Sequence, residues 1–233
     1  MQNFMTPTKK TQKYARVEHA IVAVDVVVLS VIEGRLNVLL TQTNKPELKG
    51  LWAVPGGLVA PDESLDAAVS RVLATKTGLT NVLTEQLATF GDPGRDPFGR
   101  VISVAYIALV HADAQTLATT REYDAIAWRP VDYLPRMAYD HKEIVRTAVQ
   151  RLRARLTYTT IARGILAEEF TLTEMQELYE HILGHTLDKR NFRKKILSAG
   201  IIEKTGRQRR GQRSRPAALY RFRTNTTQII DLL

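Results

Sequence analysis

The chain has 233 residues, 44% of them hydrophobic, which allows one large domain or two small ones, each with an ordinary core. Its formal net charge is +9 at pH 7, and the absence of cysteine excludes disulfides and cysteine–zinc sites. The longest apolar run, 20–32, contains Asp25 and is too short to span a bilayer, so it predicts a buried strand. Residues 1–17 are polar, lack the apolar core of a secretion signal and are expected to be flexible. We therefore expect a soluble cytoplasmic protein.

The excess positive charge is concentrated near the C-terminus. Residues 158–233 carry +6 of the net charge of +9, and the segment 188–215 alone has 11 basic residues against two acidic ones. A polyanion is the natural partner of such a local patch, and a solvated basic loop is the alternative.

Residues 18–157 predict a layered α/β (α+β) domain. Two β-branched apolar runs, 19–32 and 36–44, predict a hairpin because Gly34 lies in the turn between them. Further strands are expected at 51–54, 85–91, 100–110 and 125–131. A helix is predicted to begin after Ser64 and to end at Gly78, since its apolar residues recur every three or four positions. A second helix, 140–156, is expected to be capped by Asp140. Strands and helices in this order favour an α/β/α sandwich.

Residues 158–233 predict a winged helix-turn-helix domain. A short helix, or the end of one, is expected at 161–168, and another begins with a capping box formed by Thr171 and Glu174 and ends at Gly184. A third helix, 188–199, has an apolar side made of Phe192, Ile196 and Leu197. Two strands, 201–206 and 216–223, flank a basic loop at 207–215.

The third helix and the basic loop are predicted to bind double-stranded DNA. The helix presents cations away from its apolar side, which suits the major groove, and the arginines of the loop suit phosphates or a narrow minor groove. RNA fits less well, because stacking aromatic residues are not interleaved with the charges. The predicted DNA-binding residues are Lys189, Arg190, Asn191, Arg193, Lys194 and Lys195 on the helix, and Arg207, Arg209, Arg210, Arg213 and Arg215 on the loop.

The stretch 56–79, GGLVAPDESLDAAVSRVLATKTGL, resembles the Nudix box, whose pattern is G-x5-E-x7-R-E-U-x-E-E-x-G-U, with U an apolar residue. The positions that fit are Gly57, Glu63, Arg71, Leu73, Gly78 and Leu79. The resemblance implies a loop–helix–loop whose glutamates hold divalent cations against a diphosphate. Here the later glutamates are replaced by Val72, Thr75 and Lys76. We therefore expect no catalytic residue, no metal site and no required cofactor, with hydrolysis absent or very weak.

An effector is expected near the Gly56–Gly57 loop and the former metal site. Lys76 or Arg71 is predicted to neutralise phosphate charge, while the loop carrying Phe98 and Arg100 closes over the ligand. The predicted ligand-binding residues are Trp52, Gly56, Gly57, Glu63, Arg71, Lys76, Phe98 and Arg100. Each has a structural alternative: Glu63 as a helix cap, Arg71 as a partner of a loop carboxylate, and the others as core or loop residues.

Two further groups of side chains are relevant to this site. Remote carboxylates are an alternative source of metal ligands, namely Glu85, Asp92, Asp96 and Asp113. The histidines His111, His141, His181 and His185 are expected at helix starts or on the surface.

A Nudix-like front and a winged-helix back together resemble the NrtR family of Nudix-related transcriptional regulators. The resemblance covers nearly the whole chain and includes VDVVV, GLWAVPGG, GRVISVAY, YDHKEI and LDKRNFRKKI. It implies a dimeric repressor of NAD-biosynthesis genes that binds a pseudo-palindromic operator and senses ADP-ribose or a related nucleotide; some relatives sense sugar metabolites. Two alternatives remain: a Nudix hydrolase with a nucleic-acid-binding appendage, and a constitutive DNA-binding protein whose front domain only dimerises.

Overall fold

The computed structural model describes residues 19–111, 117–118, 120, 123–209 and 216–230. The expected flexible segment 1–17 lies outside these residues, as do Asp113 and three of the predicted DNA-binding arginines, Arg210, Arg213 and Arg215. Among the described residues, none of the helices has the length and apolar character that crossing a membrane requires.

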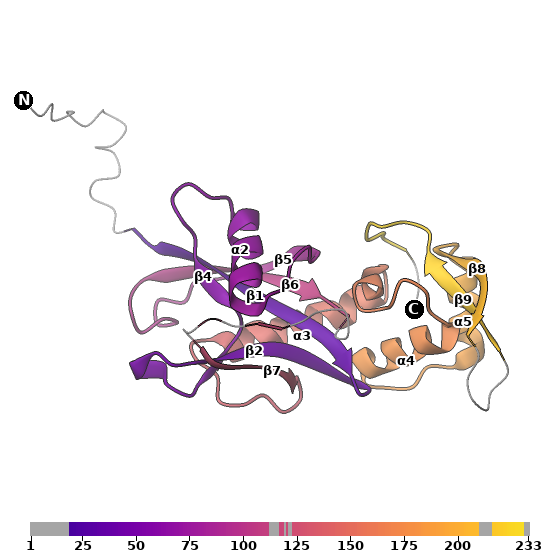
Figure 1. The fold of residues 1–233 in the computed structure, drawn as a ribbon, viewed down its shortest axis with the longest axis horizontal. Coiled ribbons are helices and arrows are strands. Elements are labelled where there is room, and N and C mark those ends of the chain that lie inside the picture. The colour runs from indigo at the N-terminus through magenta and orange to yellow at the C-terminus, as the bar shows by residue number, and fades with distance from the viewer. Residues whose placement is uncertain (1–18, 112–116, 119, 121–122, 210–215, 231–233) are drawn as a thin grey trace, which may run out of the picture.

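A seven-stranded sheet forms the centre of the N-terminal part of the molecule (Figure 1). Its strands are β1 (Ile21–Ile32), β2 (Arg35–Thr43), β3 (Trp52–Ala53), β4 (Gly56–Leu58), β5 (Thr84–Phe90), β6 (Val101–Leu109) and β7 (Tyr123–Pro130). They lie in the order β3-β2-β1-β6-β5, with β4 paired to β1 and β7 paired to β2. The pair β1–β6 is parallel and the other pairs are antiparallel. The predicted hairpin of β1 and β2 is confirmed, and Gly34 occupies its turn with φ 72°.

Helices α2 (Leu65–Thr77) and α3 (His141–Leu156) cover opposite faces of this sheet. Alternate residues of a strand point to opposite faces, so β1 supplies both layers. Val26 and Val28 pack with α2, whereas Val27 and Leu29 pack with α3. Burial on both faces explains why β1 is apolar at almost every position. The expected α/β/α sandwich is confirmed; a short 3-10 turn, η1 (Pro46–Leu48), joins β2 to β3.

The ends of the two sandwich helices differ from each other in how they are capped. Ser64 accepts a hydrogen bond from the Ala67 N–H at 3.2 Å and Gly78 ends α2 with φ 77°, as predicted. Asp140 precedes α3, but its side chain makes no capping hydrogen bond. Both of its carboxylate oxygens accept hydrogen bonds from Arg95 instead, at 2.7 and 2.9 Å. The expected Asp140 cap was therefore wrong, because a charged guanidinium is a stronger donor than a backbone N–H.

The C-terminal part has the element order of a winged helix. It consists of the 3-10 turn η3 (Ile161–Gly164), α4 (Leu172–Leu183), α5 (Lys189–Ser198), β8 (Ile202–Arg209) and β9 (Ala217–Phe222). The capping box is confirmed by reciprocal hydrogen bonds between Thr171 and Glu174. Two expectations were wrong. The predicted helix 161–168 is a single 3-10 turn, and Leu197 is 50% exposed, so the buried side of α5 consists of Phe192 and Ile196.

The sandwich and the winged helix share one hydrophobic core. Leu29 of β1 and Leu152 of α3 belong to the same buried cluster as Met175 and Leu178 of α4. Figure 1 shows α4 beside the tip of the β1–β2 hairpin, where a Cβ added to Gly34 would lie 3.0 Å from the Nε2 atom of His181. Helix α4 is therefore packed against the sandwich rather than tethered by a linker.

Candidate ligand pocket and DNA-binding surface

A cavity of about 400 Å³ opens between β1, β4, the C-terminal end of α2 and the residues that precede α3. We call it the sandwich pocket. Its charged and polar lining includes Asp25, Lys45, Lys76, Arg95, Asp96, Tyr123, Tyr139 and His141. This volume is within the range of small-molecule sites.

A buried ionic network forms one wall of the sandwich pocket. The Arg95 guanidinium, whose side chain is 3% exposed, donates to both oxygens of Asp140 and, at 3.3 Å, to Oδ2 of Asp25. Ser103 donates to the same oxygen of Asp25 at 2.5 Å. His141 accepts a hydrogen bond from the Val54 N–H at its Nδ1 atom, which leaves Nε2 facing Asp25 at 3.5 Å. The network joins β1, the loop after β5 and the start of α3.

Asp25 is held as a carboxylate by this network. Burial by itself would raise its pKa, but His141, the hydrogen bond from Ser103 and the charge of Arg95 together lower it below the usual range. Removing one partner of a buried ion pair destabilises a protein, because the remaining charge is left buried without compensation. The ion pairs and hydrogen bonds therefore hold the side chains of this wall in place.

Gly56 lets strand β4 approach Asp25. A Cβ at position 56 would lie 2.0 Å from Oδ1 of Asp25 and 3.1 Å from the backbone oxygen of Val24. Because Ser103 and Arg95 hold the Asp25 side chain, it cannot simply rotate away. The glycine is thus required by the packing of the pocket wall.

We expect Gly56→Ala to destabilise the fold by about 1–3 kcal/mol, since the added methyl group overpacks a fixed site. Gly91→Ala is the matched control, because a Cβ there has its nearest neighbour at 3.9 Å. Urea unfolding followed by circular dichroism measures both changes. Equal midpoints for the two variants would contradict the steric role of Gly56.

Only some of the predicted ligand-binding residues line the sandwich pocket. Gly56, Gly57 and Lys76 do. Trp52 is 8% exposed and lies in the core, with the Arg129 guanidinium 4.6 Å from its ring centroid. The position of Trp52 therefore fits the alternative of a core residue.

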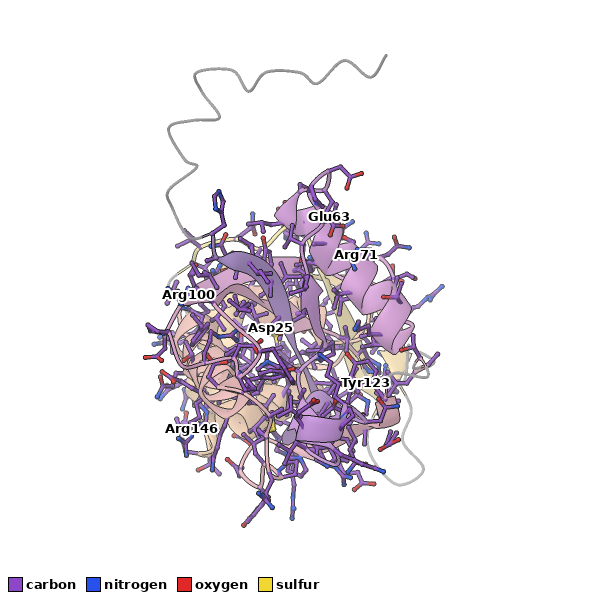
Figure 2. All side chains as sticks on the ribbon, turned by 90° about the vertical axis from the view of Figure 1, so that its left-hand side faces the viewer. Asp25, Glu63, Arg71, Arg100, Tyr123 and Arg146 are labelled. Carbon is purple, nitrogen blue, oxygen red and sulfur yellow. The ribbon has the colours of Figure 1, made fainter. Side chains whose placement is uncertain are left out.

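The remaining predicted residues lie around the pocket without lining it. Phe98 is 53% exposed, and its ring lies 5.6 Å from Nζ of Lys45, which is a pocket residue. Arg100 donates to the carbonyl of Gly91 at 2.8 Å. Figure 2 shows Arg100 on one side of Asp25, with Glu63 and Arg71 on another side next to α2.

Helix α5 presents a cationic surface outward. Its exposed polar residues are Lys189, Arg190, Asn191, Lys194, Lys195 and Ser198. Arg190 and Lys194 lie opposite the buried Phe192 and Ile196 by helical geometry. Arg193 is half-buried and donates to Oγ1 of Thr173 at 3.0 Å, so it braces α5 against α4.

The wing begins later than the sequence predicts. Strand β8 extends to Arg209, so Arg207 and Arg209 lie on a strand and not in the predicted loop 207–215. Arg209 forms an ion pair with Glu174, and Arg207 lies 3.4 Å from Glu169. These two arginines are therefore paired with acidic residues in the first turn of α4 and in the segment just before it.

Two family models match the chain. The model described as "NUDIX domain" matches residues 20–148, more than half of the chain, and the model described as "NrtR DNA-binding winged helix domain" matches residues 163–222. An "ADPR responsive transcriptional repressor NtrR" from Acinetobacter baylyi is 35% identical over 206 residues, which cover 87% of this chain and 82% of that protein.

The chain belongs to the NrtR family. The NrtR of Shewanella oneidensis in complex with a 27mer DNA superposes with a TM-score of 0.77 at 34% identity, covering 86% of this chain and 93% of that one. The isolated NUDIX domain of the same protein in complex with ADP ribose gives a TM-score of 0.55 at 31% identity, covering 63% and 99%. An "ADP-ribose pyrophosphatase" from Methanocaldococcus jannaschii is 31% identical over 136 residues, 58% of this chain and 76% of that protein.

In this NrtR chain Glu63, the glutamate that fits the Nudix pattern, is held by structural contacts. Glu63 accepts hydrogen bonds from the Ala60 N–H at 2.8 Å and from Arg71, which also donates to the Leu58 carbonyl at 2.9 Å. The hydrogen bond from Arg71 and that from Ala60 lower the pKa of Glu63 to about 2. The structural alternative for Arg71, partner of a loop carboxylate, describes its observed contact with Glu63. The alternative of a helix cap for Glu63 was wrong, because Ser64 is the N-cap of α2 and Glu63 accepts from the Ala60 N–H in the preceding loop.

The stability of this NrtR chain should depend on the ionisation of Glu63. The pKa of Glu63 is lower in the folded protein, about 2, than its ordinary value of 4.5, so its contribution is complete above pH 4.5 and is lost as the pH falls toward 2. We expect Glu63→Gln to reduce the loss of stability between pH 5 and pH 3, measured by urea unfolding at each pH. Parallel pH curves for the wild type and the variant would contradict this assignment.

Sequence reasoning missed the network that forms the wall of the pocket. In the sequence Asp25 stands out only as an interruption of an apolar run, and the pattern of the loop before β6 predicts Phe98 and Arg100, not Arg95, as ligand-binding residues. His141 begins α3, as expected, but it is buried in the pocket and not on the surface. A charged residue in the middle of a buried strand was the available signal, because such a residue requires a partner.

Proposed function

We propose that this chain is a DNA-binding transcriptional regulator whose sandwich pocket binds ADP-ribose or a related nucleotide, and that ligand binding releases DNA. The observation that carries the proposal is a pocket lined by Lys45, Lys76 and Arg95 in the same packed molecule as a cationic recognition helix. Support for the ligand comes from the name of the A. baylyi relative and from the ADP ribose complex of the S. oneidensis domain. NAD-biosynthesis genes are the proposed targets and the cytoplasm the proposed location.

Helix α3 is the proposed mechanical link between the two sites. It begins at His141 in the pocket wall, where Asp140 is clamped by Arg95. In its last turn, Arg153 donates to the Ile182 carbonyl of α4 at 2.8 Å. A ligand that shifts the Arg95–Asp140 clamp would therefore move the helix on which α4 rests. Such coupling requires different ligand affinities for the two arrangements.

We propose a homodimer as the DNA-binding form, because two winged helices related by a twofold axis match a pseudo-palindromic site. Ile21 and Leu58 are exposed apolar residues on the same face of neighbouring strands, and they support a contact between chains. Light scattering coupled to size exclusion measures the mass in solution. A monomer at micromolar concentration in the presence of operator-length DNA would exclude this form.

The test of the proposed function is a fluorescence anisotropy titration of a protein–DNA complex with ADP-ribose. The duplex is first selected by the wild-type protein from a random pool. We expect release of DNA, together with a ligand-dependent rise in the thermal midpoint of the free protein, because the ligand binds only the folded state. No release and no stabilisation at millimolar ADP-ribose would eliminate this effector; stabilisation by a sugar phosphate instead would assign the pocket to a sugar metabolite.

Hydrolysis of ADP-ribose is the second candidate function, and the similarity to the M. jannaschii pyrophosphatase favours it. We propose that it is absent, since the later pattern glutamates are replaced by Val72, Thr75 and Lys76 and the retained Glu63 is engaged by Arg71. The test is to incubate the protein with ADP-ribose and Mg²⁺ and to measure the release of AMP. Sustained turnover that Glu63→Gln abolishes would establish the hydrolase.

A further inference from the structure

The Nudix positions of α2 do not suit a divalent cation. Val72 is fully buried in the core and the Thr75 hydroxyl donates to the Arg71 carbonyl at 2.7 Å. Glu63 is held by Arg71. Among the described residues, no group of three or more histidine or acidic side chains is arranged to hold a metal ion. A hard cation requires several oxygen ligands at once, and this helix does not supply them.

The remote carboxylates do not supply the missing metal ligands. Glu85 forms an ion pair with Arg155, and Asp92 accepts a hydrogen bond from the Gly94 N–H. Asp96 lines the sandwich pocket, and its Oδ1 accepts from the Phe98 N–H at 2.8 Å. Asp113 lies outside the described part of the chain.

A cation of the protein itself stands at one of the metal-binding positions. Lys76 lines the sandwich pocket together with Gly56 and Gly57 and is half-buried. Its Nζ atom lies 3.0 Å from the Tyr123 hydroxyl and 5.1 Å from the centroid of the Tyr123 ring. The tyrosine thus fixes the direction of the ammonium group from a second wall of the pocket.

We propose that the Lys76 ammonium replaces the divalent cation, so that the sandwich pocket recognises a nucleoside diphosphate group without metal. This inference rests on the proposed function in that the pocket binds a nucleotide. An ammonium is a charged hydrogen-bond donor, so Lys76, which is directed by the Tyr123 hydroxyl, can donate to a phosphate oxygen and repels a divalent cation from the same place. Tyr123 positions Lys76, and the open backbone at Gly56 and Gly57 gives a diphosphate room beside it.

The experiment is isothermal titration calorimetry of ADP-ribose into the full chain, once in EDTA and once in Mg²⁺. We expect the two dissociation constants of the wild type to agree within about threefold, because no metal contributes to the affinity. Lys76→Met should weaken binding roughly tenfold or more in both buffers, the effect of losing one charge-assisted hydrogen bond. Lys76→Arg should restore most of the affinity. Lys49→Met, an exposed lysine outside the pocket lining, is the matched control and should bind like the wild type.

Each contrary outcome has a separate meaning. Binding by the wild type in Mg²⁺ but not in EDTA would overturn the metal-free inference and leave the proposed function standing. Equal affinities of Lys76→Met and the wild type would overturn the role of Lys76 alone. The absence of binding heat in both buffers would overturn the metal-free inference and the proposed function together. Circular dichroism of each variant confirms that it is folded, and recovery in Lys76→Arg separates loss of charge from loss of packing.

Discussion

Replacing Arg190 and Lys194 with alanine should weaken DNA binding by tenfold or more at moderate salt. Both side chains project from α5 on the side opposite its buried residues, where a recognition helix meets DNA. Each phosphate contact that is lost should also reduce the slope of log affinity against log salt concentration by about 0.9. Fluorescence anisotropy at several KCl concentrations, with the selected duplex, measures both quantities.

The matched control is the double substitution Lys142→Ala and Arg146→Ala. It removes the same two residue types at the same spacing, from exposed positions of α3 in the sandwich. Both residues lie in the first half of α3, which packs against the sandwich sheet, and not in the winged helix (Figure 1). If the control weakens binding as much as the α5 variant does, net charge and not the recognition helix determines affinity.

Arg153→Met should uncouple ligand binding from DNA release. The substitution removes the hydrogen bond between α3 and the Ile182 carbonyl but keeps much of the apolar stem of the side chain. We expect ADP-ribose affinity and DNA affinity, each measured alone, to stay within about twofold. The factor by which ADP-ribose lowers DNA affinity should fall several-fold, since substitutions between coupled sites change the coupling by about 0.5–2 kcal/mol.

The control for this prediction is Arg151→Met, an exposed arginine on the same helix. Anisotropy titrations with and without saturating ADP-ribose give the coupling factor for each variant. An unchanged factor in Arg153→Met would show that α3 does not transmit the signal through this contact. A changed factor in Arg151→Met as well would point to a general weakening of α3.

Features that depend on neighbouring residues in the chain were predictable from the sequence. The hairpin turn at Gly34, the Ser64 cap and the capping box of Thr171 and Glu174 are local devices, and the structure confirms them. The loss of carboxylates from the Nudix pattern was equally visible, because it needs only spacing within one helix.

Features that depend on contacts between distant segments were not predictable in this way. Asp140 has the position and chemistry of a helix cap, yet Arg95, 45 residues earlier, takes its carboxylate. Arg209 has the position of a wing residue, yet Glu174 on α4 pairs with it. In both cases a charged residue from another element binds the side chain in place of its expected local partner. Only the packed structure shows which partner is bound.

The core shared by the sandwich and the winged helix has a thermodynamic consequence. Leu152 and Met175 are buried in the same cluster, so neither part can open without exposing apolar surface of the other. The chain should therefore unfold in a single cooperative step rather than as two independent domains. A nucleotide held by the sandwich would then delay the melting of the recognition helix, although it is bound at a distance, and DNA would protect the empty pocket in return.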